Sequence, residues 1–290
     1  MPFEALLLVL AAALLHATWN IVAKQAGGDH RFAFIGAAMV GVLWAPVALW
    51  FGWHELPRWG LAEWGIVALS ALVHVLYFDT LLRGYRAADL TVVYPVARGS
   101  APLVTAAAAV LLLGERLSLA GVLGVLAVCG GVFLIAGGPN VFRRAKDTAR
   151  VRTGLRWGAL TGLLIAGYSV IDGYAVKVLL VGPILLDYFG NLLRLPMLLP
   201  AVWRDRAGFG AVLQAQWRHA LVVATLGPVA YVLVLYALKI APLSHVAPAR
   251  EVSMLIAAVL GGKLLGERDR GLRIAGATCI AGGVAALALG

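Results

Sequence analysis

The sequence predicts an all-α integral membrane protein whose ten transmembrane helices form two inverted five-helix repeats. Three observations lead to this fold class: the composition, the number of long apolar stretches, and a motif that occurs twice. Of the 290 residues, 62% are hydrophobic and 13% are charged, whereas soluble domains have about 45–50% apolar and about 25% charged residues. Both departures indicate a chain that lies largely within lipid.

The net charge of +10 does not indicate a nucleic-acid-binding protein. The basic residues lie in short connections between apolar stretches rather than on one continuous face, so we expect no nucleic-acid partner and expect contact with membrane lipids instead. Cys129 and Cys279 lie inside apolar stretches, far from any metal-ligand spacing, so we expect neither a metal nor another cofactor. The N-terminus has Glu4 and no basic residue before its apolar stretch, which argues against a cleaved signal peptide.

Ten stretches are long enough to cross a bilayer, which takes about 20 apolar residues with roughly 17–25 allowed. Their connections are short, except for a polar, basic segment near the middle of the chain. That segment divides the chain into a first repeat at 1–138, a linker at 139–155 and a second repeat at 156–290. The ten predicted spans are 3–23, 32–52, 62–82, 91–113, 118–137, 156–178, 182–202, 218–238, 242–265 and 271–289.

The repeated motif begins with a proline and an arginine, continues as an apolar helix and ends at Gly-Glu-Arg. It reads YPVARGSAPLVTAAAAVLLLGER at 94–116 and APAREVSMLIAAVLGGKLLGER at 247–268. Aligning the two Gly-Glu-Arg tripeptides places Arg98 on Arg250, as expected for an internal repeat. One extra residue in the first half brings three further pairs into register: Pro95 with Pro248, Arg86 with Lys239 and Lys24 with Lys177.

A repeat with an odd number of spans has its second copy inverted relative to the first, as in many secondary transporters, whose site lies near the midplane between the repeats. Lysines and arginines in the connections mostly follow the odd-numbered helices. The positive-inside rule then puts those loops in the cytoplasm and both termini on the other side. The connections after even-numbered helices hold only Arg58, Arg116, Lys177 and Lys239.

The order helix, PxxR, apolar helix, LGER and Gly-rich helix, repeated over ten spans, resembles the EamA family of the drug/metabolite transporter superfamily. The resemblance covers essentially the whole chain, and its most specific parts are the Gly-Glu-Arg junctions and the Gly-rich helices at 121–138 and 271–290. It implies a transporter of a small metabolite, built as two EamA-like repeats. We expect a multi-pass protein of the bacterial inner (plasma) membrane, with no enzymatic activity.

Polar side chains inside the spans define the candidate site. A charged group at the centre of a spanning helix costs about 2.5–3.5 kcal/mol on insertion scales, so it normally faces a cavity or a partner. Helical spacing groups these residues on faces of the first, fourth, sixth, seventh and ninth helices, which indicates a shared cavity. The predicted substrate-binding residues are His16, Trp19, Asn20, Tyr94, Arg98, Tyr168, Asp172, Asn191, Arg194 and Arg250.

Arg98 and Arg250 are the strongest candidates, because a guanidinium binds carboxylate or phosphate through two parallel hydrogen bonds. The sequence suggests an asymmetry between them: Arg98 has no neighbouring acid, whereas Glu251 stands beside Arg250. The alternative that Arg250–Glu251 and Asp187–Arg194 are structural pairs stays open. Asp172 and Glu251 are candidate proton carriers, and Glu115 and Glu267 are predicted to hold the Gly-Glu-Arg junctions by hydrogen bonds to the next helix.

The predicted function is a secondary transporter that moves a small polar metabolite with an anionic group, amino-acid-like or another organic anion, by alternating access. The chain has no Walker A signature, so we expect no ATP hydrolysis. A flippase for a lipid-linked carrier is the main alternative. A membrane-embedded enzyme is disfavoured, because the chain has no HExxH and no GxSxG motif.

Overall fold

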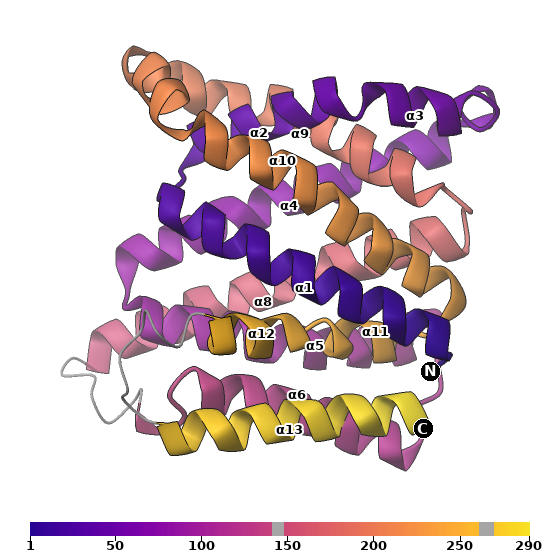
Figure 1. The fold of residues 1–290 in the computed structure, drawn as a ribbon, viewed down its shortest axis with the longest axis vertical. Helices are drawn as coiled ribbons and strands as arrows, with labels where there is room; N and C mark the ends of the chain where they lie inside the picture. Colours follow the sequence, from indigo (N-terminus) through magenta and orange to yellow (C-terminus); the bar gives the residue numbers. More distant parts are fainter. Residues whose placement is uncertain (141–147, 261–269) are drawn as a thin grey trace.

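All regular secondary structure in residues 1–140, 148–260 and 270–290, which the computed structural model describes, is helical (Figure 1). The second Gly-Glu-Arg tripeptide, with Glu267, lies outside these described residues. The helices of the first half are α1 (Phe3–Ala26), α2 (His30–Leu43), α3 (Ala45–Gly52), the 3₁₀ turn η1 (Leu56–Arg58), α4 (Leu61–Ala87), α5 (Leu90–Leu113) and α6 (Leu119–Ile135).

The helices of the second half are α8 (Thr148–Lys177), α9 (Pro183–Arg204), the 3₁₀ turn η2 (Arg206–Gly208), α10 (Phe209–Ile240), α11 (Leu243–Ala249), α12 (Val252–Leu260) and α13 (Arg270–Leu289). The second half has a similar order, except that one helix, α9, precedes its 3₁₀ turn and that two short helices, α11 and α12, follow α10.

The two halves pack against each other along their whole length. Helix α1 packs on α10, α8 on α4 and α5, α2 on α9, and α6 on α13. Figure 1 shows α6 and α13 at one edge of the bundle and α2 and α9 at the opposite edge. Both termini lie at the same end, where the amino group of Met1 donates to the carbonyl oxygens of Leu287 at 3.3 Å and Ala288 at 3.0 Å. Every one of these helix pairs joins one half to the other, so the core lies between the halves.

Glycines allow α6 and α13 to approach at backbone distance. A Cβ atom on Gly131 would lie 2.6 Å from the carbonyl oxygen of Gly276, and one on Gly124 would lie 2.8 Å from that of Gly283. Because the earlier glycine of one helix meets the later glycine of the other, the two helices run antiparallel. Small residues at such contacts are the usual means of close helix packing in membranes.

Two of the predicted spans are broken rather than continuous. The predicted span at 32–52 consists of α2 and α3, which are bent by 53°, and Pro46 in the first turn of α3 explains the bend because proline lacks the N–H that would continue the helix. The predicted span at 242–265 is interrupted at Arg250 and Glu251. There the backbone makes tighter bonds three residues apart, such as Glu251 N to Pro248 O at 2.9 Å, which are typical of functional breaks in helices.

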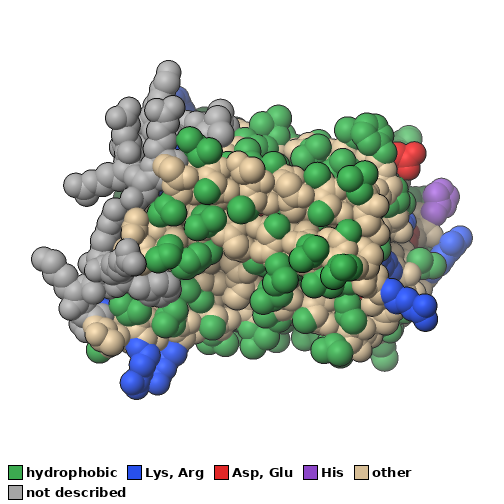
Figure 2. Space-filling model, turned by 90° about the horizontal axis from the view of Figure 1, so that it is seen from below, with side chains coloured by type: hydrophobic (Ala, Val, Ile, Leu, Met, Phe, Trp, Pro, Cys, Tyr) green, Lys and Arg blue, Asp and Glu red, His purple; other side chains and the backbone are tan. Residues whose placement is uncertain are grey.

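The outer surface matches a membrane protein. Six of the described helices are long and apolar enough to cross a bilayer, or seven if α2 and α3 form one bent span. The prediction of ten spans is therefore confirmed only in part. Leucines 111, 112, 119 and 123 are exposed on α5 and α6. Figure 2 shows a face with hydrophobic side chains spread across it and the visible charged side chains gathered at its two ends.

Candidate functional site

Arg98 forms an ion pair with a residue of the other half. It lies on α5, three residues after Pro95, and its Nη2 atom is 2.9 Å from Oε2 of Glu251 at the break between α11 and α12. The side chains are only 17% and 8% exposed. Oε2 of Glu251 and Nε of Arg98 are both buried with no hydrogen-bond partner among the described residues. The pair therefore joins the two halves while leaving polar groups incompletely satisfied.

Arg250, in contrast, has no carboxylate within ion-pair distance among the described residues. Its guanidinium lies over the ring of Tyr231, with 5.6 Å between Cζ and the ring centroid. A cation above an aromatic face is attracted by the ring quadrupole, but the ring itself carries no net charge. The prediction that Arg98 is unpaired and that Glu251 serves Arg250 is therefore wrong.

The reason that Glu251 pairs with Arg98 and not with Arg250 is geometric. Adjacent residues on a helix do not face each other, so the position of Glu251 directly after Arg250 in the sequence does not bring their side chains together. Glu251 instead points to α5. Adjacency in the sequence carried no information about which arginine the acid would reach.

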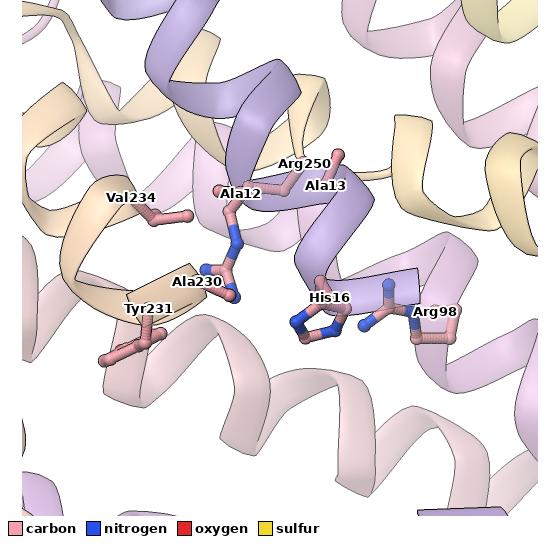
Figure 3. Close-up of a pocket in the computed structure, with 8 residues that line it drawn as sticks. All are labelled: Ala12, Ala13, His16, Arg98, Ala230, Tyr231, Val234 and Arg250. Atoms are coloured by element: carbon pink, nitrogen blue, oxygen red, sulfur yellow. The ribbon is translucent and has the colours of Figure 1, made fainter. Parts of the chain in front are cut away.

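A small internal cavity lies between the two arginines (Figure 3). Its volume of about 10 Å³ is near the minimum that holds one water molecule. Figure 3 shows the ring of His16 between the guanidinium groups of Arg98 and Arg250, with Tyr231 beside Arg250. Helices of both halves contribute to the wall. The lining residues are Ala12, Ala13, His16, Arg98, Ala230, Tyr231, Val234 and Arg250.

Behind Tyr231 lies an aromatic and acidic cluster. The hydroxyl of Tyr231 donates to Oδ2 of Asp172 on α8, whose side chain is buried. Tyr168, one turn earlier on α8, stacks on His74 with ring centroids 4.0 Å apart and an angle of 22°. Asp172 and Tyr168 therefore do not line the cavity themselves, and Tyr231 connects Asp172 to it.

The predicted residues on α9 form a separate group. Nη1 of Arg194 donates to Oδ1 of Asn191 at 3.3 Å, and Nδ2 of Asn191 donates to the backbone oxygen of Asp187 at 2.8 Å. Neither Asn191 nor Arg194 lines the cavity. The suggested Asp187–Arg194 pair is not among the ion pairs of the described residues.

Three further predicted residues lie near the cavity without lining it. Trp19 contacts the edge of His16, with ring centroids 4.8 Å apart, and its buried Nε1 has no hydrogen-bond partner. Asn20 is exposed and donates to the backbone oxygen of His16, on its own helix, at 2.8 Å. Tyr94 is partly buried and packs against the main apolar core. Of the ten predicted binding residues, His16, Arg98 and Arg250 line the cavity.

Tyr231 was missing from the prediction because the eighth predicted span contains no charged residue in its central part. A signal was present nonetheless. Tyr231 follows Pro228 by three residues, the same spacing that separates Arg98 from Pro95, and Arg250 also follows a proline closely. A polar residue just after a helix proline is thus the shared signature of three of the cavity residues.

Glu115 holds a junction at one end of the bundle. Its carboxylate accepts hydrogen bonds from the backbone N–H groups of Leu243 at 2.7 Å and Ser244 at 2.9 Å, and from Nζ of Lys177 at 3.0 Å. Burial alone would raise the pKa of Glu115, but these donors bring it below its ordinary value. The predicted structural role is correct, but the partners are α11 of the other half and Lys177 at the end of α8 rather than the next helix.

No group of three or more His, Cys, Asp or Glu side chains in the described part of the chain has the arrangement of a metal site. The polar groups that line the cavity are two guanidiniums, an imidazole and a phenol. Guanidiniums are cationic donors without acceptor capacity. The chemistry available is therefore the binding of an electron-rich or anionic group.

A helical bundle with an apolar exterior and an internal polar cavity shared by two similar halves is an integral, multi-pass membrane protein. The profile of the EamA-like transporter family matches residues 3–137 and 152–289, so the chain belongs to that family. A solved structure described only as "Crystal structure of protein" is similar over 100% of this chain and 98% of its own, with a TM-score of 0.77 and 17% identity. At that identity the likeness concerns the fold alone. No curated protein matches the chain.

Proposed function

We propose that this protein is a secondary transporter that moves a small polar metabolite with an anionic group across the membrane by alternating access. The observation that carries the proposal is the internal cavity in which Arg98 and Arg250, one from each half, lie on either side of His16. Buried cationic side chains within a membrane are costly and normally serve a substrate or ion pathway. Membership of a transporter family favours this reading over an enzyme.

The packing supports an arrangement of ten spans as two inverted repeats. By their order in the two halves, α1 corresponds to α8 and α4 to α10. The contact of α1 with α10 therefore corresponds to the contact of α8 with α4. Helices α6 and α13, which occupy the same place in each half, pair with each other in antiparallel orientation through their glycines. Such self-pairing is expected when a two-fold axis in the membrane plane relates the halves.

The size of the cavity supports a moving structure. About 10 Å³ is far below the roughly 300–1,000 Å³ of typical ligand pockets. A metabolite can therefore enter only when the halves separate on one side. The break at Arg250 and Glu251 provides a hinge beside the site, because discontinuous helices at the binding site are characteristic of transporters with inverted repeats.

The chain lacks a Walker A signature, so the proposed energy source is an ion gradient or exchange of solutes. Asp172 and Glu251 remain the acids proposed to carry a proton, since both are buried close to the cavity wall. The distribution of Lys and Arg favours termini outside the cytoplasm. The proposed location is the inner membrane of a bacterium.

The test is uptake of radiolabelled solutes into liposomes that contain the purified protein. The panel holds monocarboxylates, zwitterionic amino acids, phosphate esters and an uncharged sugar, each measured with and without the same compound trapped inside. We expect exchange of at least one anionic compound above that of protein-free liposomes. Exchange of the uncharged sugar alone, or of no compound in the panel, would contradict the proposed function.

A further inference from the structure

The positive charges at the cavity outnumber the carboxylates paired with them, and this difference indicates the class of ligand. The inference rests on the proposed function. Two guanidiniums reach the cavity. Glu251 neutralises one of them, because its carboxylate lies 2.9 Å from Arg98 and not within ion-pair distance of Arg250. Asp172 accepts a hydrogen bond from the hydroxyl of Tyr231 and forms no ion pair with Arg250. Arg250 is therefore left without a carboxylate within ion-pair distance in the described part of the chain.

The position of Arg250 is fixed by its neighbours. The residue directly follows α11. Three backbone hydrogen bonds span the break: Arg250 N to Val246 O at 3.1 Å, Glu251 N to Pro248 O at 2.9 Å and Ser253 N to Arg250 O at 3.1 Å. Its guanidinium lies over Tyr231. The hydroxyl of Tyr231 is in turn bonded to Asp172, so the ring beneath the cation has little freedom to turn.

The other polar group of the wall does not change this balance. His16 makes an edge contact with Trp19, lies between the two arginines and carries no carboxylate that could balance either of them. The remaining wall consists of Ala12, Ala13, Ala230 and Val234. These small apolar side chains accept a short apolar substituent and provide no partner for a second charge.

We propose that Arg250 is the anion-binding arginine of the cavity, and that its ligand is a metabolite with a single carboxylate rather than a dianionic phosphate. A carboxylate matches the planar fork of one guanidinium. A dianion requires the second guanidinium as well, and Arg98 can serve it only by leaving Glu251 without its partner. An uncompensated buried charge is strongly unfavourable, so the Arg98–Glu251 pair acts as a filter against dianions.

The first test measures thermal unfolding of the detergent-purified protein with sodium propionate or sodium phosphate at pH 8, at ionic strength matched with sodium chloride. A ligand that binds only the folded state raises the unfolding midpoint. We expect a saturable rise of about 3–6 °C with propionate, given the usual scaling for a chain of this size, and none with phosphate beyond the salt control. Equal rises with both anions, or no rise with propionate, would overturn the inference.

Two variants locate the effect. Arg250→Gln should abolish the propionate shift. Arg218→Gln should leave it unchanged, because Arg218 also lies over an aromatic ring, Trp217 at 5.4 Å, but on the exposed surface of α10. A propionate shift that survives in Arg250→Gln would assign the anion to another residue.

Glu251→Gln provides a test that remains valid if Arg250→Gln does not fold. With Glu251 uncharged, Arg98 is free as well, so phosphate should now raise the midpoint of this variant. Unchanged selectivity for propionate in Glu251→Gln would refute the filter. Propionate binding without transport of any solute would refute the transporter proposal but not the site, whereas transport without carboxylate binding would refute the site alone.

Discussion

The three arginines within the bundle have three different kinds of partner. Arg98 has a carboxylate, Arg250 an aromatic face and Arg194 a neutral amide. A buried ion pair contributes little net stability, but removing one member of it leaves a charge in an apolar environment. This cost applies to Arg98, whose removal would leave Glu251 without a cation, and not to Arg250 or Arg194, whose partners are uncharged.

Arg98→Gln is expected to lower the free energy of unfolding by about 3–5 kcal/mol, because it leaves Glu251 buried without its cation. The double variant Arg98→Gln/Glu251→Gln should recover much of that loss. Thermal or denaturant unfolding in detergent, arranged as a double-mutant cycle, measures the coupling. Losses that simply add would show that the two side chains do not interact.

Tyr231→Phe removes the hydrogen bond to Asp172 and leaves a buried acceptor with one partner fewer. A loss of about 1–3 kcal/mol in unfolding free energy is expected. Tyr174→Phe serves as the control, because Tyr174 lies on α8 near Asp172 in sequence but is 39% exposed. Equal effects of the two substitutions would argue against a structural role for the Tyr231–Asp172 bond.

At this scale the sequence identified the buried charges but not their partners. Arg98, Asp172, Arg250 and Glu251 were recognisable because charged residues in apolar helices are rare. The pairing of Arg98 with Glu251 was not, because it joins positions of the two halves that only the packing of α5 against α11 and the following turn brings together. Tyr231 was missed because no charged residue lies one turn away on its helix, whereas Arg98 and Asp172 mark the faces that hold Tyr94 and Tyr168.

Among the elements, the contact of α6 with α13 depends on backbone approach, and one glycine tests it. A Cβ on Gly131 would lie 2.6 Å from a backbone oxygen of α13, whereas one on Gly130 meets nothing within 4 Å. Gly131→Ala should therefore lower the stability by about 1–3 kcal/mol through overpacking. Gly130→Ala should be neutral or stabilising by up to about 1 kcal/mol through helix propensity. Thermal unfolding of both variants checks this, and a neutral Gly131→Ala would mean that the helices are further apart.

The junction at Glu115 is the second test at the scale of elements. Because the folded protein lowers the pKa of Glu115, its charge stabilises the fold at pH values above the unfolded pKa of about 4.3. That contribution is lost as the pH falls through the still lower pKa of the folded protein. Glu115→Gln should therefore cost about 1–3 kcal/mol at pH 7.

The stability difference between Glu115→Gln and the unsubstituted protein should narrow as the pH falls below about 4.3, the pKa of an unperturbed glutamate. Unfolding midpoints measured from pH 7 downward give this difference. Glu4→Gln, at an exposed position in the first turn of α1, is the matched control. A difference that stays constant down to the most acidic pH would exclude the charge of Glu115 as its cause.

The sequence predicted the helices well where apolar stretches are long, as in α1 and α4. It did not predict the breaks after Leu43 and Ala249. A proline within a helix breaks some helices and leaves others continuous, so its position in the sequence does not show where a break occurs. Pro95 lies within the continuous α5, whereas Pro248 lies just before the turn at Arg250. Which outcome occurs depends on whether neighbouring helices satisfy the freed backbone groups, and this is a property of the packing.

In the whole molecule as proposed, two similar halves enclose one site that opens to each side in turn. The family match over 3–137 and 152–289 gives the two halves, and the repeated motif with its Gly-Glu-Arg ends had already revealed them in the sequence. The cavity itself was beyond prediction, because its wall combines α1, α5, α10 and α11, and their relative placement follows from contacts between the halves.

Accessibility of Ala230 tests this central claim most directly. A cysteine at this buried cavity position is introduced after Cys129 and Cys279 have been replaced by serine. It is then exposed to a membrane-impermeant thiol reagent in right-side-out and inside-out vesicles. Leu123→Cys on the exposed face of α6 is the control for sites outside the cavity. The account predicts that the cysteine at position 230 reacts from both sides of the membrane, and reaction from one side only would contradict it.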